Sequence, residues 1–152
     1  MPGYSDADGM RNYLGEALLA QFTADSGAAV DDERLKAVIT EASDLIDSYL
    51  GARYVVPVTA AKSVRVIAPH CREIAKAILL GRRLGNRFDP QGETNLLHEA
   101  FAWLKRIADR KASLPDAAEL VSSTSGAGAG VAGSDVLVFG DPQDPSSGGA
   151  LL

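Results

Sequence analysis

The sequence has one cysteine, one tryptophan, few aromatic residues and no long apolar run. Cys71 cannot form a disulfide within the chain, so we expect stability to come from packing. The longest apolar stretches, such as residues 74–80, are interrupted by Lys76 and fall short of the roughly 18–20 residues that a membrane helix needs, so no membrane contact is predicted. The first ten residues carry acids instead of the basic region of an export signal, which predicts a protein that stays in the cytoplasm or in an assembly made there.

Residues that could carry catalysis, bind a cofactor or hold a metal are also scarce. His70, His98 and Cys71 do not have metal-ligand spacing, and no Ser or Cys has an evident base beside it. The tail contains the letters G-x-G-x-x-G at residues 128–133, but a dinucleotide site needs a strand before this motif and a helix after it. We therefore predict no catalytic residue, no cofactor and no metal, and a protein that is not an enzyme.

Charge is distributed in blocks along the chain, whose net charge is -5. Residues 1–50 hold ten acids and three bases, residues 51–112 hold five acids and twelve bases, and residues 113–152 hold five acids and no base. The acidic and basic blocks could neutralise each other within one fold. Alternatively, they could attract other copies of the chain or another partner, because complementary charge steers association and fixes register.

Seven bases form two groups near the ends of predicted helices: Arg82, Arg83 and Arg87, and then Lys105, Arg106, Arg110 and Lys111. They could complement helix dipoles, contact nucleic-acid phosphates or pair with an acidic neighbour. We favour the acidic neighbour, because a chain with a pI near 4.9 is an unusual dedicated nucleic-acid binder. The seven residues are the candidate electrostatic interface.

Apolar residues at helical spacing predict four helices. The first ends near Phe22, and the second begins at the acidic residues 31–33 and stops at Gly51. The third contains Pro69, with Ser63 as its favoured cap, or else it starts at Pro69, and it closes at Gly81 and Gly85. The fourth is expected to start at Asp89 and Pro90 and to bury the side chains of Leu97, Ala100, Phe101, Leu104, Ile107 and Ala108.

Two further segments are not helical. Residues 55–58 form an apolar stretch around Pro57 that we interpret as a loop packed on the helices. From Ser122 the chain is rich in Gly and Ser, interrupted by the apolar residues Val136, Leu137, Val138 and Phe139, which could form one short strand or fill a groove on a partner. Trp103 lies off the apolar stripe of the fourth helix and is either a second packing surface or an exposed anchor for another chain. The prediction is an all-α protein, with a four-helix bundle-like domain over residues 1–115 and an extended arm over residues 116–152.

The stretch from Ala42 to Val58 has the spacing I-D-x-Y-L-x-x-R-Y-x-x-P, formed by Ile46, Asp47, Tyr49, Leu50, Arg53, Tyr54 and Pro57. This motif resembles one in the head-tail connector proteins of Mu-like bacteriophages and prophages. Residues 73–80 and 97–114 are similar to the later helices of that family, so the resemblance covers residues 1–115. We interpret the motif as structural: the rings of Tyr49 and Tyr54 would be buried, and Arg53 would pair with Asp47 and hold the 55–58 loop.

The resemblance implies a virion protein at the neck, where the head meets the tail, assembled in the host cytoplasm. Such an adaptor forms a ring, commonly of twelve subunits, between the portal protein and the tail terminator or stopper, and double-stranded DNA passes through its channel. Its C-terminal arm embraces the portal or a neighbouring subunit, a role for residues 136–139 here. The alternative is a small helical DNA-binding or DNA-packaging accessory protein.

Overall fold

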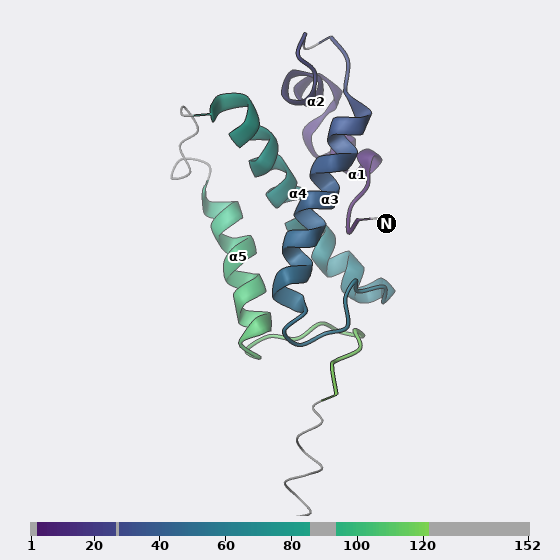
Figure 1. The fold of residues 1–152 in the computed structure, drawn as a ribbon, viewed down its shortest axis with the longest axis vertical. Coiled ribbons are helices and arrows are strands. Elements are labelled where there is room, and N and C mark those ends of the chain that lie inside the picture. The colour runs from purple at the N-terminus through teal and green to yellow at the C-terminus, as the bar shows by residue number, and fades with distance from the viewer. Residues whose placement is uncertain (1–2, 27, 86–93, 122–152) are drawn as a thin grey trace, which may run out of the picture. The chain divides into compact units, whose positions relative to one another are not determined.

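The computed structural model describes residues 3–26, 28–85 and 94–121, and within them the chain forms five helices and an isolated β-bridge. The helices are α1 (Ala7–Leu14), α2 (Glu16–Thr23), α3 (Asp32–Leu50), α4 (Ala61–Leu84) and α5 (Thr94–Ala108). Helix α3 packs against both α4 and α5, and α1 and α2 cover the other side of α3 and α4 (Figure 1). The predicted all-α class is confirmed.

The first predicted helix is instead two short helices, because the chain turns at Gly15. Gly15 has a φ of 84°, a left-handed conformation that an α-helix cannot contain and that residues with a Cβ rarely adopt. The Asp6 side chain caps α1 by accepting a hydrogen bond of 2.7 Å from the Gly9 amide. The apolar spacing across residues 10–18 therefore predicted the helical residues but not the break.

Helix α3 has the predicted position. Asp31 caps it through the Arg34 amide at 3.0 Å, and the helix ends at Leu50. Its buried apolar face is formed by Leu35, Val38, Ile39, Ala42, Ile46 and Leu50, five of which are fully inaccessible to solvent. The period of about 3.6 residues places these side chains in one stripe, which is why α3 can form the centre of the bundle.

Helix α4 runs through Pro69, as the preferred interpretation required, but Ser63 does not cap it. The helix begins at Ala61, so Ser63 lies inside the first turn, where its side chain is fully buried. At the other end, Gly81 is helical and only Gly85, with a φ of 52°, ends the helix. Gly81 therefore does not stop the helix, which ends where Gly85 adopts the positive φ that is common after the last turn.

Helix α5 buries Ala100, Leu104 and Ile107 against the core, as predicted, while the proposed Asp89 and Pro90 cap lies outside the described residues. Trp103 packs within the chain: its ring stacks on His70 of α4, with centroids 4.2 Å apart and an interplanar angle of 19°. The loop after α3 packs as predicted only in part, because Val58 is 5% exposed but Val55 is 52% exposed. The bond before Pro57 is cis.

Candidate functional site

The family-like motif at the end of α3 lies in and around the core. Ile46, Leu50 and Tyr54 are buried, with no more than 1% of any of these residues exposed. Tyr49 is partly buried and packs its ring on Phe101 of α5, with centroids 6.0 Å apart. The motif therefore joins α3 to α5 through packing, in agreement with a structural role for its aromatic residues.

The predicted pair between Arg53 and Asp47 is wrong. The Arg53 guanidinium forms an ion pair with Glu119, with Nη2 and Oε1 2.7 Å apart, and donates a second hydrogen bond of 2.6 Å to the Ala112 carbonyl. The reason is the end of α3: Gly51 and Ala52 turn the chain, so Arg53 faces the segment that follows α5 and not the preceding helical turn. We call this segment, Ala112–Glu119, the C-terminal strap.

Tyr54 holds the same strap from inside the core. Its hydroxyl accepts a hydrogen bond of 2.9 Å from the Leu114 amide, and its backbone forms an antiparallel bridge with Glu119. The next amide, that of Val55, donates to the Ala118 carbonyl at 2.9 Å. Because Tyr54 is 1% exposed and Leu114 is 6% exposed, the Leu114 amide has no access to water as a substitute partner.

The strap in turn caps helix α4. Asp116 accepts hydrogen bonds from the backbone amides of Lys62 at 3.2 Å and Ser63 at 2.9 Å, and from the Ser63 hydroxyl at 2.8 Å. Hydrogen bonds from Ser63 lower the pKa of Asp116 below its usual value of 3.8. The first turn of α4 has no local side-chain cap, so a carboxylate 53 residues away in sequence satisfies its amides.

A second polar network that the sequence did not predict ties the start of the chain to the motif. The Tyr4 hydroxyl donates to Asp47 and accepts a hydrogen bond of 2.8 Å from the Val58 amide. Burial, together with the hydrogen bond to Asp47, raises the pKa of Tyr4. Burial also raises the pKa of Asp47, although the hydrogen bond from Tyr4 acts in the opposite direction. The motif aspartate therefore holds residue 4, and no sequence signal links positions 43 residues apart.

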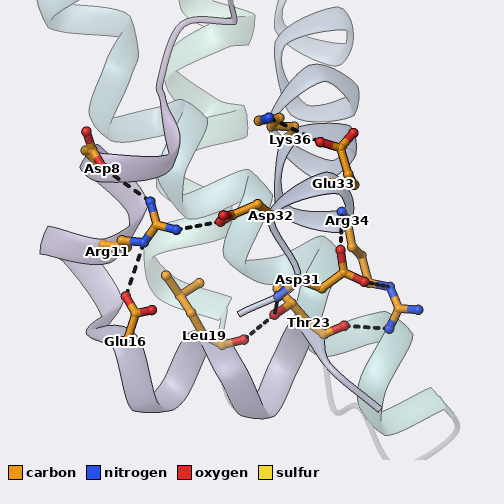
Figure 2. A network of polar contacts seen from close by, with 10 residues as sticks. All are labelled: Asp8, Arg11, Glu16, Leu19, Thr23, Asp31, Asp32, Glu33, Arg34 and Lys36. Carbon is orange, nitrogen blue, oxygen red and sulfur yellow. Dashed lines mark hydrogen bonds and ion pairs between the residues drawn. The ribbon is translucent and has the colours of Figure 1, made fainter. Parts of the chain in front are cut away.

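Bases in residues 1–50, the acidic first third of the chain, pair with acids of the same third, as Figure 2 shows. Residues 51–112 are the basic second third. Arg11 contacts Asp8, Glu16 and Asp32. Arg34 contacts Asp25 and Asp31, and Lys36 contacts Glu33. Neutralisation between the acidic and basic thirds occurs at Glu41 of α3 and Arg82 of α4. Because ten acids share three local bases, the first third keeps an excess of negative charge.

The six described bases of the candidate electrostatic interface do not form one surface. Helices α4 and α5 run in opposite directions (Figure 1), so Arg82 and Arg83 lie at the opposite end of the bundle from the second group. Lys105, Arg106, Arg110 and Lys111 are exposed and form no ion pair with any described residue. Arg87 and the arm residues Val136, Leu137, Val138 and Phe139 lie outside the described residues.

Within residues 3–26, 28–85 and 94–121, no three His, Cys, Asp or Glu side chains are grouped as metal ligands. Among the helices described, none is long and apolar enough to span a bilayer. Cys71 is buried, and burial raises the pKa of its thiol.

The comparison with known families decides the identity. The family model described as "Bacteriophage Mu, Gp36" matches residues 4–132, which include the motif, the strap and the start of the tail. The chain belongs to the bacteriophage Mu Gp36 family. Membership confirms the resemblance to a Mu-like phage protein and extends it past residue 115. No curated protein matches the chain. This member of the Gp36 family is therefore a phage protein whose motif residues Arg53 and Tyr54 hold the C-terminal strap at the end of α3.

Proposed function

We propose that this Gp36-family protein is a head-tail adaptor of the virion neck. It forms a ring, with twelve subunits as the expected number, between the portal protein and the tail terminator or stopper. It acts by assembly and not by catalysis, it is assembled in the host cytoplasm, and DNA passes through the ring. The observation that carries the proposal is the family match, which includes the motif that resembles head-tail connectors.

The strap supports an adaptor with a C-terminal arm. Arg53, Tyr54 and Asp116 contribute side chains to the hydrogen bonds that fix the backbone up to Glu119. The point at which the chain leaves the helical body is therefore set by the fold. A fixed exit point sets where the reach of a long tail is counted from, which is Glu119.

Charge supports association between copies. The first third has an excess of acids, and the four bases at the end of α5 have no ion-pair partner among the described residues. When the acidic region of one copy meets the α5 bases of the next, the contact is heterologous, and such contacts close into rings when the rotation between copies allows it.

Light scattering tests the adaptor proposal on the full chain, alone and mixed with the cognate portal complex, at low and moderate salt. We expect a ring-sized mass to join the portal complex, and Lys105→Glu to weaken the association about tenfold at low salt. Arg65→Glu is the matched control, because it makes the same charge change at an exposed position of α4 outside the two groups. A chain that ignores the portal complex contradicts the proposal.

The same α5 bases favour one alternative, a DNA-binding or DNA-packaging accessory protein. Phosphate contacts by these four side chains would give an affinity for duplex DNA that falls steeply with salt. The logarithm of the binding constant would fall with the logarithm of the salt concentration with a slope of about -0.9 for each phosphate neutralised. Salt-dependent duplex binding without portal binding would replace the adaptor proposal with this alternative.

A further inference from the structure

A groove of about 760 Å³ lies where the segment before α1 crosses α3 and α4. Ile39 of α3 and Val64 and Ala68 of α4 provide apolar lining. Tyr4 lines the opposite side, with its backbone held to α3 by a hydrogen bond of 3.0 Å from its amide to Ser43 Oγ. The volume lies within the roughly 300–1,000 Å³ of sites that bury most of a small ligand or a short peptide segment.

The groove is also lined by two polar side chains, those of Ser5 and Arg72, that lack hydrogen-bond or ion-pair partners among the described residues. Ser5 lines it, and the Ser5 hydroxyl oxygen is buried without a hydrogen-bond partner among the described residues. Arg72 lines it as a cation with no ion pair to any described residue. The acids of the same lining are already engaged, Asp6 by the Gly9 amide and Asp8 by Arg11. An occupant with an apolar centre and an acidic flank therefore complements this groove.

The chain itself contains such a segment. After residue 112 the sequence has no base, and its tail has one run of four large apolar residues, Val136–Phe139, with Asp135 before it and Asp141 shortly after it. Sixteen residues separate Glu119 from Val136, and a chain of that length spans at most about 55 Å. Helix α4, with 24 residues, is about 36 Å long, so the segment can reach past the body that carries it.

We propose that the α3–α4 groove of each copy receives residues 136–139 of the neighbouring copy. The apolar side chains would cover Ile39, Val64 and Ala68, and the flanking acids would pair with Arg72. This inference rests on the proposed ring and names the contact that links its subunits. We name a neighbour as the occupant because a groove on one copy and a segment on the next form a heterologous pair, which joins successive copies into a ring when the rotation between them closes, as the proposed ring requires.

Disulfide trapping between two full-length preparations tests whether the arm of one copy enters the groove of another. One preparation carries Thr40→Cys, at an exposed position on the groove lining, and the other carries Val138→Cys. Both have Cys71→Ala, so that the introduced thiols are the only ones. The matched control replaces Thr40→Cys with Ser48→Cys, which is exposed on the same helix two turns away from the groove. The two preparations are mixed with the portal complex, oxidised mildly and analysed by non-reducing electrophoresis, with masses from light scattering.

We expect the Thr40→Cys pair to give at least about tenfold more crosslinked heterodimer than the Ser48→Cys control, because disulfides need Cα atoms within about 7 Å. Arg72→Glu should reduce the yield severalfold. A ring of normal mass without a crosslinked heterodimer overturns the proposed contact between arm and groove and leaves the adaptor proposal standing. A third preparation carries Thr40→Cys and Val138→Cys on the same chain. A bond formed there within the monomer, without a heterodimer from the two mixed preparations, also overturns the proposal, since the groove then binds its own arm. The absence of both ring and crosslink contradicts both proposals.

Discussion

Replacing Tyr54 by phenylalanine isolates the contribution of one hydroxyl to the attachment of the strap. The Tyr54→Phe variant would keep the ring and the packing of a residue that is 1% exposed, but the Leu114 amide would lose its partner at 2.9 Å. An unsatisfied donor in this environment costs about 1–3 kcal/mol of unfolding free energy. For a domain of this size, about 1 kcal/mol corresponds to roughly 4 °C, so we expect Tm to fall by about 4–12 °C.

Thermal unfolding followed by far-ultraviolet circular dichroism measures the global effect, and amide hydrogen exchange at Leu114 measures the local one. Tyr49→Phe is the matched control, because it removes the hydroxyl of a motif tyrosine that makes no hydrogen bond within the described residues and keeps the ring against Phe101. We expect this control to change Tm by less than about 2 °C. Equal Tm values for the two variants, with Leu114 still protected, would refute the structural interpretation of Tyr54.

Three further outcomes are expected. Arg53→Ala should lower Tm, because it removes the ion pair to Glu119; an unchanged Tm with failed ring assembly would make Arg53 an interface residue instead. Burial lowers the pKa of His70 below 6.5, with a further contribution from nearby Arg106. The His70 imidazole therefore binds a proton more tightly in the unfolded chain than in the folded one. Unfolding free energy should therefore fall as pH decreases below 6.5, and His70→Phe should flatten that slope in denaturant titrations from about pH 7.5 to about pH 5.5. The pKa of Asp116 is lowered, so its contribution is present above 3.8 and is lost as pH falls below that value. Asp116→Ala should accordingly lower Tm at neutral pH, and the difference from the parent chain should shrink in acid.

Local patterns in the sequence were sufficient for the bounds of α3. The stripe from Leu35 to Leu50 repeats every three to four residues, and Asp31 and Gly51 flank it, so the bounds of α3 follow from the residues themselves. The break at Gly15 was missed because glycine is tolerated within a helical pattern, and only the backbone conformation distinguishes a stop from an interior residue. Gly81 is the opposite case, because it was predicted to close the helix together with Gly85 and instead stays helical.

Long-range contacts could not be predicted in the same way. Asp47 was expected to bind Arg53, six residues away, yet it binds Tyr4, while Arg53 binds a carboxylate 66 residues further along the chain. Asp116 likewise replaces the local cap expected at Ser63. The packing of the helices decides which side chains come within hydrogen-bond distance of each other. Spacing along the sequence carries no information about that choice.

The sequence by itself determined the all-α class, the apolar faces of the helices and the motif that marks the family, because these depend on residue type and on spacings of a few residues. The tertiary structure alone decided which segment of the chain the motif holds. Only when α3, α4 and α5 are packed together does the strap lie between Tyr54 and the start of α4, where buried amides must find partners inside the protein.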